Sequence, residues 1–542
     1  MASTDTTPPA YRIGTRYRIN RLDQDYDALV IGSGMGGMTA AACLAKAGKK
    51  VLVLEQHYTA GGFTHTFQRA GYEWDVGLHY VGNMNHPDAS GKKLMDYISN
   101  GQLQWADMDS HYDRIFLGDR HYDLVAGTNN CKAELLKHFP DEEKALDQYF
   151  TALEQIRLGV SLIAMEKALP PAAGLPVYLL RRCIQGKNFR RTTRQVLESI
   201  TDNQTLIAVL CGQWGDNGMP PAESSFVIHS MIARHYMQGA CYPVGGSAMI
   251  AKSIIPVIEA AGGKVMTYAC VSEILLEKGR ACGVIMADGH TIRAPVVISN
   301  AGIFNTFTRL LPQSVSKRTG YLRKMQNVER SVASICLYIG LDASAETLKL
   351  PKTNFWVYPS ADYEKDIERF EQNPQQSPIP LIYISFPSAK DPDFCNRYPD
   401  KATIEIVAPG PYEWYRQWHD KPWGKRGDDY LAFKEMWSQR LLQELLKKMP
   451  WLQDHIDYYE LSTPLSTDHF CRYSEGEIYG LSHNPARFDQ HWLKPRTRIP
   501  GLFLTGQDIM SCGIMGAGVG GVLTAASVMG GKGMKLVKDL LA

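Results

Sequence analysis

Three glycines and one acidic residue near the start of the chain have the types and spacing that a dinucleotide site needs. Gly32, Gly34 and Gly37 stand in GxGxxG spacing, and Glu55 follows 23 residues after Gly32. In this motif the first glycine permits a tight turn, the second lets the backbone approach a pyrophosphate, and the third lets a helix pack closely on a sheet. The acid can accept hydrogen bonds from ribose hydroxyls. The spacing therefore predicts a dinucleotide-binding site.

A strand, a helix and a second strand must position these residues. Residues 27–31 predict a short buried strand, a helix begins at the third glycine, and residues 50–54 predict the second strand, which ends at the acid. The turn into the helix, with Met35 and Gly36, presents free N–H groups and the positive end of the helix dipole to the phosphates. We therefore expect an α/β unit of the Rossmann type.

Composition limits the classes of protein that fit. At 542 residues the chain is too long for one core and favours two interleaved domains. The 58 basic and 56 acidic residues leave a net charge of only +2, which gives no reason to expect nucleic acid as a partner. The 11 cysteines are scattered without a CxxC pair, and the histidines lack HxxxH or HExxH spacing, so we expect no disulfide framework and no metal site.

The N-terminus and the cysteines bear on location. Residues 1–24 lack an apolar h-region and are predicted to be a flexible lead-in, with packing of residues 11–22 on the surface as the alternative. Unpaired cysteines fit a reducing compartment. We expect an intracellular, cytoplasmic protein.

A second glycine turn narrows the cofactor. Gln56 follows the acid directly, and the pair Gly61 and Gly62 comes soon after it. This pattern resembles flavoproteins of the amine oxidase and phytoene desaturase superfamily, in which the chain folds back along FAD. Dehydrogenases that use NAD do not usually carry it. The resemblance implies FAD as the cofactor.

Two later segments resemble the remaining flavin-binding parts of that superfamily. In the middle segment, which starts at YPVGG, the resemblance places the backbone near Val271 at the adenine end of FAD, and a return strand ends at Asn300. In the C-terminal segment, a strand and turn contain Gly506 and Asp508, and a helix with Gly516 follows. The resemblance implies that Asp508 binds the ribityl hydroxyls and that the helix N-terminus faces the flavin.

These segments imply a discontinuous Rossmann-type FAD-binding domain with an interleaved α+β substrate domain. The FAD-binding domain is predicted to comprise residues 25–95, 242–302 and 496–542, and the substrate domain residues 96–241 and 303–495.

Narrower motifs point to one branch of the superfamily. The sequences LEQH, GLHYVG, GEIYGL and LTGQD resemble the all-trans-retinol 13,14-reductase (retinol saturase) branch, to which carotenoid isomerases are related. The resemblance spans residues 26–530 and is loosest over 96–230. Phe63 and Thr64 stand where saturases of this type often have cysteines. The resemblance thus implies a retinoid, a carotenoid or an unsaturated fatty chain as substrate.

The implied reaction is a two-electron exchange between flavin and a C–C bond of a long unsaturated lipid. Saturation of a double bond by hydride transfer is the first expectation. Desaturation, cis/trans isomerisation and amine oxidation remain alternatives, as does a non-catalytic carrier of prenyl lipids like the GDP dissociation inhibitors. The electron donor or acceptor is not identified by any motif, since no second nucleotide site is visible.

His79 and Tyr80 are the candidate catalytic residues. They lie in GLHYVG, which the resemblance places beside the isoalloxazine ring. Either side chain can donate a proton or orient a substrate, and His79 can equally be a structural histidine.

Residues 157–194 form a candidate membrane-contact segment. Residues 168–180 are uncharged but contain three prolines and are too short to span a bilayer, and residues 181–194 carry six basic residues and no acid. An apolar stretch followed by a basic cluster suits monotopic contact with anionic lipid headgroups. A core-packed helix with a solvated basic face is the alternative.

Overall fold

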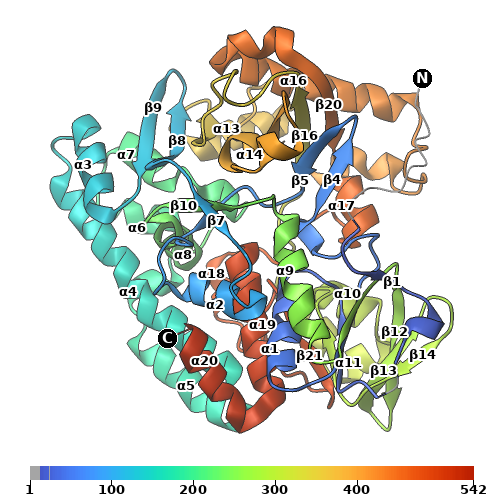
Figure 1. Cartoon of the computed structure of the whole chain (residues 1–542). Coiled ribbons are helices and arrows are strands. Elements are labelled where there is room, and N and C mark those ends of the chain that lie inside the picture. Colours follow the sequence, from blue (N-terminus) through green and yellow to red (C-terminus); the bar gives the residue numbers. More distant parts are fainter. Residues whose placement is uncertain (1–11, 24, 542) are drawn as a thin grey trace.

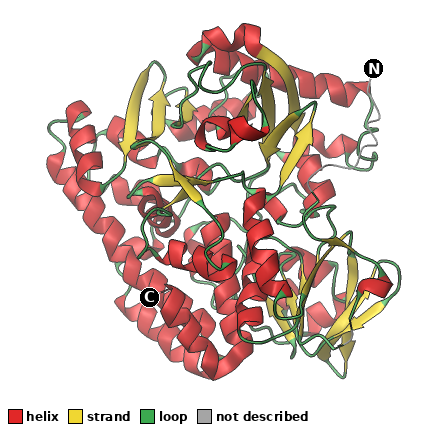
Figure 2. Cartoon of the chain, in the orientation of Figure 1, coloured by secondary structure: helices red, strands yellow, loops and turns green. Residues whose placement is uncertain are grey.

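A six-stranded parallel sheet and a seven-stranded mixed sheet organise the molecule. The computed structural model describes residues 12–23 and 25–541. In Figure 1 the parallel sheet lies in the lower half of the view and the mixed sheet in the upper half. Figure 2 shows that helices surround both.

The parallel sheet draws its strands from three distant parts of the chain. The strand order is β1-β11-β3-β2-β15-β21, and every pairing is parallel. Both faces of such a sheet are covered, so its strands are continuous apolar runs such as ALVI in β2 and VLVL in β3. The strands are Thr15–Arg16 (β1), Lys264–Thr267 (β11), Val51–Leu54 (β3), Ala28–Ile31 (β2), Val297–Ser299 (β15) and Leu502–Leu504 (β21).

Alternate residues of β2 contact different layers. Ala28 and Val30 belong to a buried cluster with helices α1 (Met35–Lys46) and α9 (Ala248–Glu259), and α19 (Gly513–Met529) packs on α1. Leu29 and Ile31 belong to a second cluster with a three-stranded sheet on the other face. The strands of that sheet are Val271–Glu277 (β12), Arg280–Met286 (β13) and Thr291–Arg293 (β14).

Part of the predicted lead-in over residues 1–24 packs on the rest of the protein. Strand β1 pairs with β11 at the edge of the parallel sheet, and Ile13 is buried against that core. Edge pairing satisfies backbone groups that a free tail would leave in water. Residues 1–11 and 24 lie outside the described residues.

The seven-stranded sheet belongs to the other half of the chain. Its order is β20-β16-β19-β18-β17-β8-β9, and all pairings are antiparallel except that of β17 with β8. Its strands are Ile456–Ser462 (β20), Ser334–Leu341 (β16), Ala402–Pro409 (β19), Ile382–Ser385 (β18), Asn354–Tyr358 (β17), His111–Leu117 (β8) and Arg120–Val125 (β9).

The two faces of this sheet have different neighbours. Ile404 and Ile406 of β19 belong to an apolar cluster with residues of α13 (Tyr363–Gln372) and α16 (Asp428–Lys448). The opposite face meets the hairpin of β4 (Thr66–Arg69) and β5 (Tyr72–Asp75), where Trp74 Nε1 donates to the carbonyl of Ile339 at 3.0 Å. Residues on that opposite face can therefore reach toward the parallel sheet.

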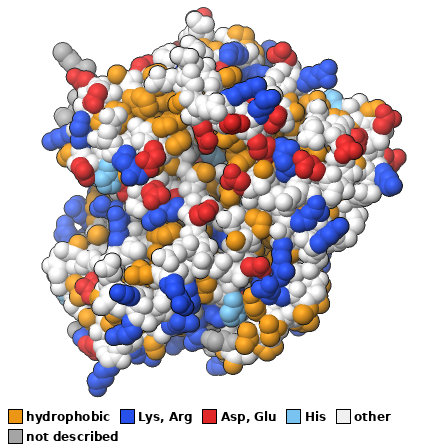
Figure 3. All heavy atoms as spheres, turned by 180° about the vertical axis from the view of Figure 1, so that it is seen from behind, with side chains coloured by type: hydrophobic (Ala, Val, Ile, Leu, Met, Phe, Trp, Pro, Cys, Tyr) orange, Lys and Arg blue, Asp and Glu red, His pale blue; other side chains and the backbone are white. Residues whose placement is uncertain are grey.

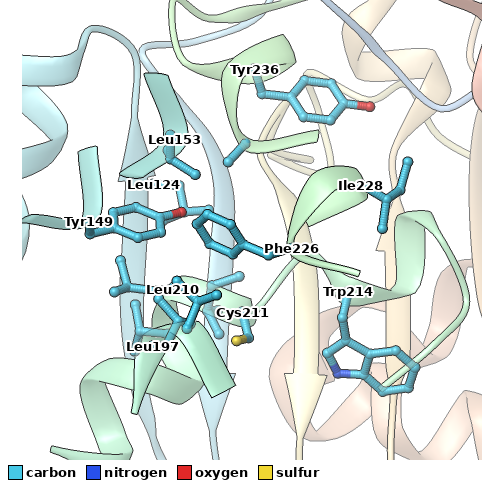
Figure 4. Packing of buried hydrophobic residues seen from close by; sticks show 14 of the residues in the cluster. Leu124, Tyr149, Leu153, Leu197, Leu210, Cys211, Trp214, Phe226, Ile228 and Tyr236 are labelled. Carbon is cyan, nitrogen blue, oxygen red and sulfur yellow. The ribbon is translucent and has the colours of Figure 1, made fainter. Parts of the chain in front are cut away.

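A helical layer covers the flank of the mixed sheet. A buried apolar cluster fills this layer, and Figure 4 shows Tyr149 of α4 beside Phe226 of α8 within it, with Leu153 of α4 close by. The helices are Thr128–His138 (α3), Glu143–Ala168 (α4), Pro171–Ile184 (α5), Thr193–Leu197 (α6), Gln204–Cys211 (α7) and Phe226–Tyr236 (α8). A small sheet of β6 (Val81–Gly82), β10 (Ala240–Pro243) and β7 (Trp105–Asp107) lies near the predicted domain boundaries.

The basic cluster after residue 180 is not one solvated face. The Arg181 side chain is 2% exposed and its Nε lies 3.2 Å from a Glu166 carboxylate oxygen in α4, while Arg194 pairs with Glu198 and Glu364. Arg181 follows Gly174 by two helical turns, and both face α4, because residues seven apart share one side of a helix. The sequence pattern therefore overstated the free positive charge.

Candidate functional site

A cavity of about 500 Å³ lies where strands of the parallel sheet end. Its lining continues past Val76 and His79 to Cys336 and Val407 of the mixed sheet, so it spans the space between the two sheets. Ligands of open α/β sheets bind outside the carboxyl ends of the strands. Eleven residues predicted to bind the cofactor line this cavity: Gly32, Gly34, Met35, Gly36, Glu55, Gln56, Gly61, Gly62, Val271, Asn300 and Asp508.

The turn between β2 and α1 has an open anion-binding geometry. Gly32 has a φ of 95°, and the N-cap residue of α1 is Gly34, which has no side chain to cap the first N–H groups of the helix. A Cβ atom on Gly34 would lie 2.9 Å from Nδ2 of Asn300, and one on Gly62 would lie 2.8 Å from the Cα of Gly34. The missing side chains thus bring two glycine turns together beside free helix N–H groups, as a pyrophosphate requires.

The carboxylate of Glu55 is held at the cavity wall. One oxygen accepts the backbone N–H of Ser33 at 2.8 Å and its hydroxyl at 2.7 Å, and the other accepts the N–H of His57 at 2.8 Å. These donors orient the group at the end of β3. Because Oε1 accepts only the N–H of His57, it has a further acceptor site, through which Glu55 can accept from a ribose hydroxyl.

Asp508 lines the cavity with a carboxylate that is only partly hydrogen-bonded. Its Oδ2 accepts the N–H of Ile303 at 2.8 Å, whereas its Oδ1 is buried without a partner among the described residues. Burial raises the pKa of Asp508 above its usual value, and Arg487 opposes that rise. An unsatisfied buried carboxylate oxygen is costly, so a hydroxyl donor on a bound ligand is the natural partner.

The start of α19 forms the adjoining wall. Gly513 and Ile514 line the cavity, and the side chain of the N-cap residue Cys512 does not cap the first turn of this 17-residue helix. Its positive end therefore points at the cavity close to Asp508.

Three residues predicted to bind the cofactor do not line the cavity, and their roles are in packing. A Cβ on Gly37 would lie 2.2 Å from the carbonyl oxygen of Gly32, one on Gly506 would lie 2.4 Å from Asn300 Oδ1, and one on Gly516 would lie 2.3 Å from the carbonyl oxygen of Ser511. Gly37 and Gly516 let backbone segments approach closely, and Gly506 makes room for the Asn300 side chain. At these three positions, the glycines shape the site through packing and do not line the cavity themselves.

His79 lines the cavity and Tyr80 does not. The His79 ring has its Nδ1 2.9 Å from Oε2 of Glu405, and burial, with Lys390 nearby, lowers the pKa of His79 to about 3. The Tyr80 hydroxyl instead donates to Asp113 at 2.9 Å, and its ring stacks on another tyrosine in the helical core. Neighbouring residues of an extended segment point to opposite sides. The prediction of Tyr80 as a catalytic contact is corrected to a core position.

Sequence reasoning missed Glu405. In the run ATIEIVAP it reads as the solvent-facing residue of an alternating strand, yet its side chain is 0% exposed. The sequence pattern could not show this burial, because the face of β19 that carries Glu405 is covered by tertiary contacts with β5 and the GLHYVG segment. Phe63 and Tyr473, whose rings stack with centroids 6.3 Å apart, also line the cavity.

Comparison with known proteins identifies the relatives. A family model described as an NAD(P)-binding Rossmann-like domain matches residues 30–98. All-trans-retinol 13,14-reductase of Danio rerio is 38% identical, with 96% of this chain and 89% of that protein covered. A second Danio rerio protein, named inactive all-trans-retinol 13,14-reductase, is 32% identical over 95% of this chain and 87% of that protein. Prolycopene isomerase of Arabidopsis thaliana is 28% identical over 94% and 84%.

Solved structures agree on the fold. An oxidoreductase from Methanosarcina mazei superposes with a TM-score of 0.61 at 18% identity, covering 93% of this chain and 99% of that chain. A putrescine oxidase superposes with a TM-score of 0.59 at 16% identity, covering 93% and 99%. The chain thus shares the fold of these two structures, and the predicted α/β fold of the Rossmann type is confirmed. With its glycine turns, Glu55, Asp508 and His79 arranged around one cavity, and with identity to curated members along nearly its whole length, this chain belongs to the all-trans-retinol 13,14-reductase family.

Proposed function

We propose that the protein is an FAD-dependent reductase that saturates a C=C bond of a retinoid or a related polyene. One observation carries the proposal: His79, a group able to deliver a proton, lines the same cavity as Glu55, Asp508 and two uncapped helix N-termini. A saturation needs a hydride on one carbon and a proton on its neighbour. The cavity has room for the hydride donor, and His79 is the side chain that can deliver the proton.

FAD suits the residues present. The first turn of α1 and the glycine pair would hold the pyrophosphate, Glu55 the adenosine ribose, and the unpaired Oδ1 of Asp508 a ribityl hydroxyl. Bound in its reduced form, FAD supplies the hydride. The N-terminus of α19 would stabilise negative charge on the flavin.

The remaining lining suits an apolar chain. Phe63, Val76, Val407 and Ile478 supply apolar surface, and stacked rings can flank a flat polyene. Identity to reductases exceeds identity to prolycopene isomerase, 38% against 28%, which favours saturation over isomerisation.

An anaerobic absorbance experiment tests this function. Purified protein that is reduced chemically should be reoxidised by all-trans-retinol or another polyene, with a product that has gained two hydrogens. Bleaching of the oxidised protein by a saturated substrate would instead indicate desaturation, and a change of geometry without net redox would indicate isomerisation. A colourless protein that binds no added FAD would contradict the proposal.

We also propose peripheral contact with a membrane through α4 and α5. Six of the large apolar side chains with more than 40% exposure lie on these two packed helices: Leu158, Met165, Leu175, Leu179, Leu180 and Ile184. Figure 3, the view from behind, has hydrophobic side chains gathered at the lower right, the side on which α4 and α5 lie. Exposed patches of this kind mark interaction surfaces.

Charge next to this apolar face favours a lipid surface. Arg182 and Lys187 are exposed at the end of α5, and the exposed Arg190 follows. A helix face with leucines beside arginines and lysines suits the boundary between acyl chains and anionic headgroups. The long apolar stretch Gly513–Leu541 is a poorer candidate, because 56% of its most apolar window is buried inside the protein.

A further inference from the structure

A buried glutamate stands behind the cavity histidine. Glu405 lies in β19, the third strand of the mixed sheet, and its side chain is 0% exposed, whereas the His79 side chain keeps 18% exposure. The two groups approach to 2.9 Å, between Oε2 of Glu405 and Nδ1 of His79. Both atoms are buried, and neither meets the geometry of a hydrogen bond with any described residue, although the two lie within contact distance of each other. Each is therefore the available partner of the other.

The ring orientation leaves one nitrogen for the ligand. The Nδ1 atom of His79 is buried, and no described residue hydrogen-bonds to its Nε2. Since His79 lines the cavity, Nε2 is the ring nitrogen that can meet a bound substrate. A proton donor must lie within hydrogen-bond reach of the atom that receives the proton, and this geometry provides that access.

The other oxygen of Glu405 and the surrounding charges hold the acid in place. Its Oε1 accepts the backbone N–H of Asp75 at 2.9 Å. Lys390 donates to the carbonyl of His79 at 3.0 Å and to the hydroxyl of Ser385 at 2.8 Å. The titratable groups around Glu405, apart from His79, come from three elements: Asp75 of β5, Cys336 and Tyr338 of β16, and Lys390 of α14 (Pro387–Lys390).

This environment favours neutral forms of both partners at pH 7. Burial raises the pKa of Glu405 to about 8, although Lys390 and the N–H of Asp75 act in the other direction. Burial lowers the pKa of His79 to about 3. A protonated carboxyl beside a neutral imidazole donates its O–H to Nδ1, and the ring proton then resides on Nε2.

We infer that Glu405 and His79 form a proton relay, in which His79 protonates the substrate carbon and Glu405 replaces the lost proton. This inference rests on the proposed saturation. After hydride has reached one carbon of the double bond, the Nε2–H bond of His79 breaks and a C–H bond forms at the neighbouring carbon. The O–H bond of Glu405 breaks as Nδ1 gains its proton. Glu405 ends as a carboxylate, which the Lys390 side chain stabilises, and His79 ends neutral.

The relay is reset through the open side of the ring. When product leaves, water in the cavity can protonate Nε2, and Nδ1 returns its proton to Glu405. The fully covered carboxyl has no such access of its own. His79 is thus the catalytic residue, and Glu405 is a positioning and proton-supplying residue that acts through it.

A measurement without substrate tests the resting state of the pair. Infrared difference spectra of the flavin-loaded protein should contain the C=O stretch of a protonated carboxyl at pH 7, which disappears near pH 8 and is absent from Glu405→Gln. Nitrogen NMR of labelled histidine should assign the ring proton of His79 to Nε2, with His79→Gln identifying the signal. Two results would overturn the relay: an ionised Glu405 at pH 7, or a neutral His79 ring that carries its proton on Nδ1 instead of Nε2.

Single-turnover kinetics test the relay in action. The rate at which the reduced protein is oxidised by a polyene should fall as pH rises through about 8, since the donor form is lost. Glu405→Gln keeps the shape and can still accept the N–H of Asp75, yet it cannot supply a proton. We expect this variant to bind flavin normally, to lose the alkaline limb of the pH profile and to react ~10²-fold more slowly at saturating substrate.

Asp113→Asn is the matched control. Asp113 is equally buried, with a pKa raised to about 6 mainly by burial, but it contacts Tyr80, Gln213 and Asn354 rather than His79. This variant should keep the alkaline limb near pH 8. An unchanged rate and limb in Glu405→Gln would overturn the relay. The wild type could reduce no polyene while the spectra show a proton shared between Glu405 and Nδ1 of His79. That result would contradict the proposed saturation but would support the hydrogen bond between the two side chains.

Discussion

Asp508 and Glu55 show how single carboxylates prepare the cavity for a polar ligand within apolar surroundings. Both are buried, and both are oriented by backbone N–H groups rather than by cations, through Ile303 for Asp508 and through Ser33 and His57 for Glu55. Hydrogen bonds from N–H groups fix direction without neutralising the charge. The remaining acceptor sites are therefore available to hydroxyl groups of a bound dinucleotide.

Replacement of Glu55 should weaken flavin retention. In Glu55→Gln the new amide group faces donors on Ser33 and His57, so the side chain turns and loses hydrogen bonds to charge that are worth about 1.5–3 kcal/mol. We expect FAD affinity to fall by roughly tenfold to a hundredfold, as measured by equilibrium dialysis of apoprotein with FAD. Glu259→Gln, an exposed position on α9, is the control and should retain flavin fully. Equal affinity in Glu55→Gln and wild type would remove Glu55 from the site.

His79 should affect chemistry without affecting cofactor binding. In His79→Gln a side chain of similar reach remains, but the proton donor is lost, so turnover should fall by ~10²-fold or more. Flavin absorbance and the apparent KM for the polyene should stay within about twofold of wild type, since a proton donor stabilises the transition state more than the bound substrate. Undiminished kcat with full flavin occupancy would exclude His79 from the reaction.

Local residue patterns predicted the dinucleotide turn but not the partner of the histidine. Gly32, Gly34 and Glu55 are neighbours through one strand–helix–strand unit, so their spacing in sequence determines their spacing in the fold. Glu405 meets His79 across 326 residues of chain, and an alternating strand pattern cannot state which face will be covered. The orientation of Tyr80 away from the cavity depends in the same way on tertiary packing.

At the scale of elements, α1 is the part whose position matters most for the site. It packs against β2 and α19 and carries the phosphate-facing N-terminus. Most of its side chains are small, as the sequence MGGMTAAACLAK shows. The helix backbone can therefore approach the sheet and α19 closely. The strands on which α1 lies were predictable because parallel strands are continuous apolar runs. The edge strand β1 was not, because TR carries no apolar signal.

A side chain on Gly37 should displace α1. Its Cβ would lie 2.2 Å from the carbonyl oxygen of Gly32, which is backbone and cannot move aside without shifting the turn. Overpacking of this kind costs typically 1–3 kcal/mol. We expect Gly37→Val to lower the melting temperature and to lose flavin together. Gly186→Ala, where no atom lies within 4 Å of the added carbon and φ is −64°, should change neither property. Normal flavin content in Gly37→Val would mean that α1 tolerates displacement.

At the scale of the whole molecule, the two sheets contribute different residues to the cavity. The parallel sheet and its helices supply the dinucleotide turn, and the mixed sheet supplies Cys336, Val407 and the buried acid behind His79. Each half alone lacks one requirement of the reaction, so the chemistry belongs to the space between the sheets. The exposed apolar face of α4 and α5 is separate from both and needs its own explanation.

Membrane contact through α4 and α5 predicts a loss of vesicle binding on a two-residue change. Leu175 and Leu179 lie one helical turn apart on α5 and are 46% and 54% exposed. Burial of a leucine is worth about 1.5–3 kcal/mol, so Leu175→Ser with Leu179→Ser should reduce partitioning onto vesicles by at least ~10²-fold. Co-sedimentation with phosphatidylcholine vesicles that contain phosphatidylserine measures it. Added salt should weaken wild-type binding if Arg182 and Lys187 contribute, because screening reduces their attraction to the headgroups.

The matching control is an exposed leucine on another helix. Leu431 of α16 is 57% exposed and lies on the helix that covers the outer face of the mixed sheet, so Leu431→Ser should bind vesicles like wild type. Reduction of a soluble short-chain polyene should be unchanged in the double variant, while reduction of a polyene dissolved in vesicles should slow. Equal vesicle binding by wild type and the double variant would assign the apolar face of α4 and α5 to another partner. If binding is lost and both substrates slow together, the two serines have altered the catalytic part of the protein, and the membrane assignment fails.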